Sequence, residues 1–364
     1  MLFRSSAGAV AGARMDSVAY PVIRGLYLNR FAAQSSRKMR HLFAIADSSE
    51  INGFVIDMKD EFGLNYRSKN PEIAKNAGGT RGYVGDVKAL VDSVKAHGLV
   101  PIARLVAFKD PVAAQVNPSW TVRRQDGSTW NDKEGLAWVN AHNHKVWDYN
   151  LAVAEELVDL GFEEIQWDYI RFPEPYRSLP KQVFPGATTS NPEALAAFLK
   201  LARERLNKRG ARSTADIFGL VTNIRGPLEV GQWWEKLSPV TDVLLPMVYP
   251  SHYPRGSFGI DRPNTEPYKI IKIALDTARV RDEKLGITKA EHVRPWIQAF
   301  SLGQPKYGPD QIKAQKQAAY DAGYHGWVLW SPGSMYDPFV PALDKKTDRP
   351  VAAAAGSTTG ARTP

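Results

Sequence analysis

One apolar segment of this 364-residue chain carries a carboxylate and, three residues later, a guanidinium. The segment spans residues 164–173, EIQWDYIRFP, and the two charged groups belong to Asp168 and Arg171. Its β-branched and aromatic residues are typical of a packed strand, and Pro173 ends the pairing because it has no N–H to donate. A buried charge is costly unless it is paired or used. Asp168 is therefore either half of a structural ion pair with an arginine or a catalytic carboxylate at a strand end.

Carboxylates, cations, amides and large aromatic residues also stand near the ends of other predicted strands. Aromatic faces can stack on the C–H patches of sugars, while charged and amide groups pair with hydroxyls, so this mixture suits carbohydrate chemistry. Residues two apart on a strand share a face, which groups Asp57 with Lys59 and Trp296 with Gln298. The predicted substrate-binding residues are Asp57, Lys59, Arg104, Gln166, Arg171, Tyr249, Trp296, Gln298 and Trp330.

Hydrolysis of a glycosidic bond needs two carboxyl groups across the scissile bond, one to donate a proton and one to act as nucleophile or to activate water. Asp168 is the predicted ionised partner, because Arg104 and Arg171 would favour its charged form. Asp216 is the predicted acid, because its apolar neighbours would raise its pKa. Asp57 and Glu174 are the alternatives for the second carboxylate.

The elements that must position these residues alternate along the chain. Helical patterns separate the expected strands, and strict alternation predicts a parallel sheet. Eight such units over residues 22–344 predict a single (β/α)8 TIM barrel with long βα-loop insertions, in which functional residues gather at the C-terminal strand ends. The expected strands are 22–30, 51–59, 99–108, 164–173, 213–220, 241–249, 294–302 and 326–330. The expected helices are 37–46, 84–97, 145–160, 191–208, 230–237, 267–282 and 310–322.

An open doubly wound sheet is the alternative fold. It would carry a glycine-rich phosphate loop directly after an early strand, whereas Gly78 and Gly79 fall in a long connection. Outside the barrel, residues 1–21 are predicted to be a flexible N-terminal extension, and residues 345–364, rich in Ala, Gly, Ser and Thr, a disordered tail. No apolar run approaches the roughly 18 residues of a membrane span.

Composition excludes several other classes of function. The net charge of +9 is spread along the chain rather than gathered in blocks, so nucleic-acid binding is not predicted. The absence of cysteine removes disulfides, thiolate nucleophiles and cysteine-based metal sites. His142 and His144 lack a matching ligand set, so we expect neither a metal nor an organic cofactor. The oligomeric state is not indicated.

The long connection 109–142 carries three tryptophans, Trp120, Trp130 and Trp138. Aromatic residues in a long exposed loop predict a lid or a binding wall. Lys59 at a strand end keeps open a lyase that works through a Schiff base.

Together these segments resemble the family known as the putative glycoside hydrolase domain, bacterial proteins with a distant likeness to the barrel glycosidases of the α-amylase and α-galactosidase type. The resemblance covers roughly Arg24 to Tyr336. Its carriers are residues 25–28 (GLYL), 52–60 (NGFVIDMKD), 102–111 (IARLVAFKDP), 135–139 (GLAWV), 146–150 (VWDYN), 166–173 (QWDYIRFP), 215–220 (ADIFGL), 246–253 (PMVYPSHY), 294–298 (RPWIQ) and 326–330 (GWVLW).

The resemblance implies a barrel with a glycosidase-like site, in which Asp168 holds the nucleophile position of the related retaining enzymes. One departure concerns the seventh strand, where the family pattern Trp-Leu-Gln-Asp-Phe is here Trp296-Ile297-Gln298-Ala299-Phe300. If that aspartate contacts the substrate in the family, its absence places the substrate specificity of this chain in question; if it lies outside the barrel, nothing follows from its absence.

Three functions follow in order of preference. The first is a glycoside hydrolase acting on a poly- or oligosaccharide of the cell envelope or an exopolysaccharide. The second is a carbohydrate-binding barrel of the cell envelope without catalysis, and the third is a lyase. A polymeric substrate favours an exported or envelope-associated protein, and a cytoplasmic location stays open.

Overall fold

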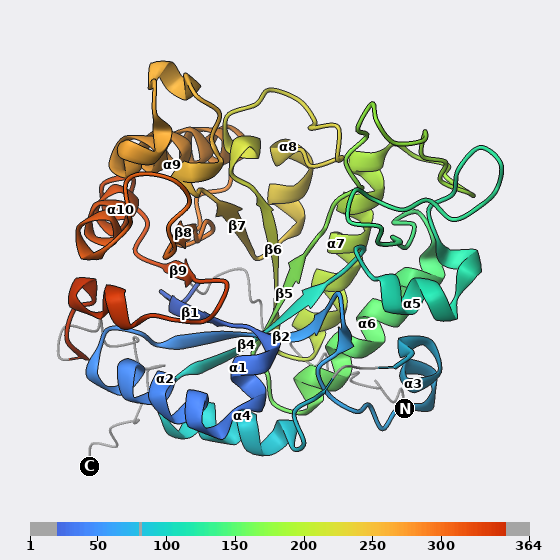
Figure 1. The fold of residues 1–364 in the computed structure, drawn as a ribbon, viewed down its shortest axis with the longest axis horizontal. Helices are drawn as coiled ribbons and strands as arrows, with labels where there is room; N and C mark the ends of the chain where they lie inside the picture. Colours follow the sequence, from blue (N-terminus) through green and yellow to red (C-terminus); the bar gives the residue numbers. More distant parts are fainter. Residues whose placement is uncertain (1–19, 80–81, 347–364) are drawn as a thin grey trace, which may run out of the picture.

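The computed structural model describes residues 20–79 and 82–346, and their centre is a closed barrel of eight parallel strands (Figure 1). The sheet order is β1-β9-β8-β7-β6-β5-β4-β2-β3, and β1 also pairs with β2, which closes the ring. The predicted TIM barrel is therefore confirmed over the open sheet. The strands are β1 (Arg24–Leu28), β2 (Gly53–Asp60), β3 (Gly63–Leu64), β4 (Val100–Val106), β5 (Glu164–Asp168), β6 (Arg212–Phe218), β7 (Val243–Met247), β8 (Trp296–Gln298) and β9 (Trp327–Trp330).

Helices surround the barrel on all sides in Figure 1, with α2 and α4 below it, α6 and α7 to the right, and α9 and α10 to the left. The α-helices are α1 (Arg30–Gln34), α2 (Ser36–Ser48), α3 (Pro71–Ala77), α4 (Val87–Ala96), α5 (Pro111–Val116), α6 (His144–Asp159), α7 (Asn191–Lys208), α8 (Trp234–Leu237), α9 (Pro267–Lys284) and α10 (Pro309–Asp321). Short 3-10 turns are η2 (Pro118–Trp120), η3 (Gly219–Thr222), η4 (Ser238–Val240), η5 (Pro250–His252), η6 (Ser257–Gly259), η7 (Pro263–Thr265) and η8 (Asp337–Ala342).

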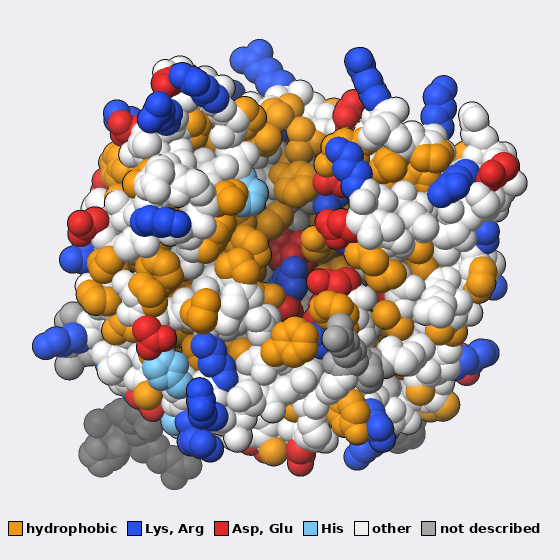
Figure 2. All heavy atoms as spheres, viewed as in Figure 1, with side chains coloured by type: hydrophobic (Ala, Val, Ile, Leu, Met, Phe, Trp, Pro, Cys, Tyr) orange, Lys and Arg blue, Asp and Glu red, His pale blue; other side chains and the backbone are white. Residues whose placement is uncertain are grey.

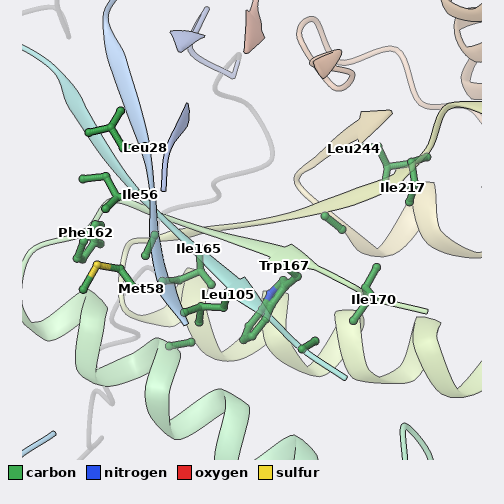
Figure 3. Close-up of a cluster of buried hydrophobic side chains, with 14 of the residues drawn as sticks. Leu28, Ile56, Met58, Leu105, Phe162, Ile165, Trp167, Ile170, Ile217 and Leu244 are labelled. Atoms are coloured by element: carbon green, nitrogen blue, oxygen red, sulfur yellow. The ribbon is translucent and has the colours of Figure 1, made fainter. Parts of the chain in front are cut away.

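Side chains that leave the outer face of the strands form the main core. Ile165 and Trp167 of β5 are fully buried there, beside Leu105 of β4 (Figure 3). Because side chains alternate along a strand, the residues between them, such as Gln166, point into the barrel. The apolar outer face therefore fixes which residues of β5 face inward, and Asp168 is one of them.

The barrel interior holds an ion-pair layer well below the C-terminal strand ends. Glu164 of β5 is fully buried and accepts hydrogen bonds from Arg294 Nη1 (2.7 Å) and Arg212 Nε (3.1 Å). These two arginines hold the pKa of Glu164 below its usual value although burial opposes them. The charge of Glu164 is thus compensated by Arg212 and Arg294 within this layer. The acidic groups nearer the C-terminal strand ends must be compensated by other cations.

The expected helices and strands exist, with boundaries shifted by a few residues. Sequence reasoning missed α1, α3, α5 and the two-residue strand β3, which pairs antiparallel with the end of β2. Each missed helix is only five to seven residues long, and helices this short gain most of their stability from tertiary packing, which a periodicity search does not detect.

The prediction for the three tryptophans of the long connection was wrong. Trp120, Trp130 and Trp138 are 6%, 0% and 1% exposed, so they form the core of a small lobe rather than a lid surface. Isolated bridges such as Thr121–Val139 hold this lobe together, and Arg123–Val183 ties it to the segment that follows β5. The lobe therefore packs against the segment that follows β5 and helps to hold it in place.

Most of the predicted N-terminal extension and C-terminal tail lies outside the described residues. Tyr20 and Pro21 of the one, and Lys345 and Lys346 of the other, are described. Their predicted flexibility stays a prediction. Among the described helices, none has the length and hydropathy that a membrane crossing requires.

Candidate active site

A cavity of about 580 Å³ opens at the C-terminal ends of the strands. Figure 2 shows a hollow at the middle of the face, where acidic and basic side chains meet beside hydrophobic ones. Charged and aromatic residues both line the cavity. The charged residues are Arg104, Asp168, Arg171 and Glu174, and the aromatic ones include Tyr169, Tyr176, Tyr249, Tyr253, Trp296 and Trp330.

Arg104 is the cation around which the acidic residues gather. It stands on β4 beside Asp57 of β2 and Gln166 of β5, as the strand register requires. Its Nη1 donates to Asp57 Oδ1 (2.5 Å), its Nε and Nη2 donate to Asp168 Oδ2, and its Nε lies 3.9 Å from Asp216 Oδ2. One guanidinium therefore faces three carboxyl groups that come from three strands. Because a single positive charge cannot compensate three negative ones, ionising each further carboxyl group costs more free energy.

Asp168 is the one of these three that reaches the cavity. Its side chain is 11% exposed and lines the cavity, while its Oδ1 accepts a hydrogen bond from the backbone N–H of Tyr169 (2.5 Å). Tyr169 adopts a left-handed backbone with a φ of 50°. Such conformations are costly for residues with side chains and gather at functional sites. Here the left-handed residue turns the chain immediately after the carboxylate.

Asp216 lies beneath the cavity rather than in its wall. It is 1% exposed, and its Oδ1 accepts hydrogen bonds from Trp296 Nε1 (2.6 Å) and Gln166 Nε2 (2.8 Å). Burial raises its pKa well above the usual value and the charge of Asp168 adds to the rise, against the opposing effects of Arg104 and the two hydrogen bonds. The predicted direction of the pKa shift is confirmed. The predicted contact with a substrate is not supported by this position.

Asp57 is buried next to Arg104. Tyr27 donates a hydrogen bond to its Oδ2 (2.5 Å), and burial raises its pKa although Arg104 and Tyr27 oppose the rise. It does not line the cavity. Its geometry is that of a partner that holds Arg104 in place, not that of a substrate-binding residue.

Arg171 lines the cavity as predicted but does not pair with Asp168. Its Nη1 lies 3.0 Å from Glu174 Oε2, and its guanidinium packs against the rings of Trp138, Tyr169 and Phe218. The arginine that pairs with Asp168 is Arg104. The sequence could not distinguish them, because the proximity of Arg104 depends on strand pairing across more than 60 positions.

Two stacked rings are part of the aromatic lining of the cavity. Tyr249 and Trp330 lie with ring centroids 5.0 Å apart and planes inclined by 21°. Phe300 contacts both rings edge-on, and Trp296 lies next to Tyr27. Tyr249, Trp296 and Trp330 were predicted from sequence to face one site, and the structure brings them together there.

Lys59, Gln166 and Gln298 were predicted to bind substrate, but none of them lines the cavity. A register shift between Asp57 and Lys59 reverses the face that Lys59 occupies, so its Nζ pairs with Asp110 (2.7 Å) outside the barrel interior. Gln166 is fully buried and donates to Asp216.

Gln298 is fully buried as well, and its Oε1 accepts from the backbone N–H of Ser251 (3.1 Å). Gln298 therefore anchors the loop after β7, and Gln166 supports Asp216 from within the barrel.

Several cavity residues were missed in the predicted site. Tyr169, Tyr176, His252 and Tyr253 all line it, and all belong to loops that follow a strand rather than to the strand itself. The segment Tyr249-Pro250-Ser251-His252-Tyr253 places two further ring-bearing residues directly after the predicted strand end, which is a signal that could have identified the last two. Burial lowers the pKa of His252.

A metal site needs a cluster of ligating side chains, and the structure describes residues 20–79 and 82–346. No group of three or more His, Cys, Asp or Glu side chains in those ranges has an arrangement that could hold a metal ion. The carboxylates around Arg104 face a guanidinium instead.

Comparison with solved structures shows the same fold in several carbohydrate-active proteins. The glycoside hydrolase domain of PgaB (BpsB) from Bordetella bronchiseptica is 12% identical, with a TM-score of 0.62 over 89% of this chain and 99% of that one. The spore cortex-lytic enzyme SleL from Bacillus megaterium is 10% identical, with a TM-score of 0.53 over 90% and 73%. The α-galactosidase TtGalA from Thermus thermophilus is 13% identical, with a TM-score of 0.52 over 86% and 58%.

At such identities these likenesses show the fold alone. No curated protein matches the chain. A family model described as "Putative glycosyl hydrolase domain" matches residues 25–336, which include all the residues that line the cavity and every barrel strand apart from Arg24, the first residue of β1. The chain belongs to this family of glycosyl hydrolase domains.

Proposed function

We propose that the protein hydrolyses a glycosidic bond of a poly- or oligosaccharide in the cavity at the C-terminal strand ends. The observation that carries the proposal is the placement of Asp168, whose carboxylate enters the cavity while Arg104 and the Tyr169 N–H fix both of its oxygens. A carboxylate in this position can stabilise the positive charge that develops at the anomeric carbon or bond to that carbon.

The aromatic lining of the cavity supports a sugar as the ligand. Tyr249 and Trp330 present ring surface to the same cavity that Asp168 and Arg171 line, where these two charged side chains can pair with hydroxyls. Family membership supports the same reaction class. We also propose, from the sequence alone, that the glycan belongs to the cell envelope or is an exopolysaccharide and that the protein is exported or associated with the envelope.

The test is the activity of the wild type and of Asp168→Asn on a panel of bacterial cell-envelope glycans and exopolysaccharides, followed through new reducing ends. Asparagine keeps the shape of the side chain and removes its charge, so we expect cleavage by the wild type alone. Equal cleavage by both proteins would show that the Asp168 carboxylate has no role in the reaction.

A carbohydrate-binding barrel without catalysis is the second candidate, and the same aromatic pair supports it. It predicts no new reducing ends with either protein, together with retention of a glycan by both in a pull-down with insoluble polysaccharide. The lyase reading has lost its support, because Lys59 is fully buried and pairs with Asp110 away from the cavity.

A further inference from the structure

The proposed hydrolysis requires a second carboxyl group within reach of the scissile bond, and the inference below rests on that proposed function. Among the described residues, the carboxylates that line the cavity are Asp168 and Glu174. Glu174 follows Asp168 by six positions in the segment that leaves β5, and its side chain is 32% exposed. It can therefore meet a ligand that fills the cavity.

The backbone around Glu174 is fixed although it belongs to no strand or helix. Gln182 Nε2 donates to the carbonyl oxygens of Pro173 (3.0 Å) and Glu174 (3.2 Å), and the Tyr176 N–H donates to the Glu174 carbonyl (3.0 Å). Upstream, the Phe172 N–H donates to the Val230 carbonyl (2.8 Å). A loop anchored at several backbone positions can hold a side chain in a defined place.

The Glu174 carboxylate is oriented by Arg171, which is itself immobilised. The Arg171 guanidinium lies 4.8 Å from the ring centroid of Trp138, 4.9 Å from that of Tyr169 and 5.0 Å from that of Phe218, and its Nη1 also donates to the Phe172 carbonyl (3.2 Å). With the cation held by three rings, its contact to Glu174 Oε2 at 3.0 Å defines where the carboxylate lies.

Asp216 and Asp57 do not have comparable access. Arg104 and Trp296 line the cavity and contact Asp216 from that side, so these two side chains stand between Asp216 and any ligand. Asp57 is 3% exposed, and both of its oxygens are bonded, one to Arg104 and the other to Tyr27. Neither carboxyl group can approach a glycosidic oxygen in this arrangement.

We propose that Glu174 is the proton-transferring catalytic residue that works with Asp168, and that Asp216 is a positioning residue that acts through Arg104 and Trp296. In the bond-breaking step, the protonated form of Glu174, released from its ion pair with Arg171, passes its proton to the glycosidic oxygen as the bond from that oxygen to the anomeric carbon breaks, and Asp168 compensates the positive charge on the carbon. A water oxygen then bonds to the anomeric carbon, and one water proton passes to Glu174. The net reaction consumes one glycoside and one water molecule and restores both carboxyl groups.

The experiment compares Glu174→Gln, Asp216→Asn and the wild type on two probes that share one sugar. That sugar is the one released from the glycan panel by the wild type, presented once as its 2,4-dinitrophenyl glycoside and once as its unactivated methyl glycoside or disaccharide. A dinitrophenolate departs without protonation, whereas an alkoxide does not, so loss of the acid affects the two probes differently.

For Glu174→Gln we expect kcat/KM to fall by about 10²- to 10⁴-fold on the unactivated probe and by less than about 10-fold on the dinitrophenyl glycoside. For Asp216→Asn we expect equal losses on both probes. A selective loss in Asp216→Asn, or equal losses in Glu174→Gln, would overturn the assignment while the proposed glycosidase remained. Absence of cleavage by the wild type on every glycan and aryl glycoside would instead refute the proposed function and this inference with it.

A matched control is Glu134→Gln, the same substitution at an exposed glutamate in the neighbouring lobe. Glu134 pairs with Lys109 (2.8 Å) and does not line the cavity. It should behave as the wild type on both probes. Thermal unfolding of all variants shows that the comparison is made between folded proteins.

Discussion

The Asp168 carboxylate receives two nitrogens of Arg104 on one oxygen, Oδ2, with Nε at 3.0 Å. The other oxygen, Oδ1, accepts the backbone N–H of Tyr169. Because separate strands and a left-handed turn provide these contacts, the carboxylate cannot rotate without breaking one of them. Its orientation toward the cavity is therefore set before any ligand arrives, which is how preorganised sites reduce the cost of reaching a transition state.

Replacement of Arg104 by methionine should destabilise the fold. The change leaves Asp57, Asp168 and Asp216 without their shared cation, and removal of one partner from a buried ion pair typically costs about 3–5 kcal/mol. The free energy of unfolding, measured with urea, should fall most at neutral pH and recover partly in mild acid, where the carboxyl groups take up protons. A loss that does not change with pH would show that lost packing, rather than uncompensated charge, is responsible.

Asp216 should make stability depend on pH in a defined direction. Because burial raises its folded pKa, the native state holds a proton that the unfolded chain has already released above a pKa of about 3.9. Stability contributed by protonated Asp216 is thus present at low pH and is lost as pH rises toward the folded pKa, by at most about 1.4 kcal/mol per pH unit.

Asp216→Asn removes this dependence. We expect the stability difference between the variant and the wild type, taken from urea midpoints across the pH range, to shift in favour of the variant as pH rises. The control is Asp242→Asn, measured by the same urea midpoints across the pH range. Asp242 lies near the opposite end of β6 and β7 from Asp216, and its carboxylate accepts hydrogen bonds from Ser213 and Arg203. Parallel curves for the wild type and Asp216→Asn would contradict the assignment of a raised pKa.

Trp330→Ala should weaken the binding of substrate more than it slows the reaction. The substitution removes one of the two stacked rings on which a sugar can pack, and we expect a roughly 10-fold rise in KM, which corresponds to about 1.4 kcal/mol of binding free energy. Steady-state kinetics on the substrate found with the panel measures KM and kcat separately. Trp233→Ala is the control, because Trp233 lies in a different surface pocket beside α9. A fall in kcat with KM unchanged would contradict a role in ground-state binding.

Lys59→Met should reduce stability without removing catalysis. Lys59 and Asp110 form a fully buried ion pair at 2.7 Å, so loss of the lysine leaves an unpaired carboxylate at a cost of about 3–5 kcal/mol. The double variant Lys59→Met with Asp110→Asn should recover part of this loss. Activity per folded molecule should stay near that of the wild type, and trapping of substrate on Lys59 by borohydride would revive the lyase interpretation.

The fold could be predicted from sequence because its signals are local. The apolar segments and the helices between them are long enough to be counted, and alternation along β5 correctly placed Gln166 and Asp168 on the inner face. The aromatic residues Tyr249, Trp296 and Trp330 were assigned to one site on the same basis.

The wrong predictions concern contacts between residues that lie far apart in the sequence. The register shift after Asp57 turned Lys59 to the wrong side, and only the pairing of β2 with β4 reveals it. The depth of Asp216 depends on Trp296, which is 80 positions away in the chain and covers it. Trp120, Trp130 and Trp138 form a core because the lobe folds on itself and on the segment after β5, a contact between distant parts of the sequence.

The left-handed Tyr169 divides residues 164–173 into a strand and a loop that have different roles. Everything before it belongs to the barrel and keeps the register of β5, whereas everything after it belongs to a loop whose path is independent of that register. Redesign of loop positions such as Tyr176 in a protein library, with Glu174 and Gln182 kept, can therefore change what the cavity accepts without disturbing Asp168. In such a library the barrel would stay unchanged, and only the loop would vary.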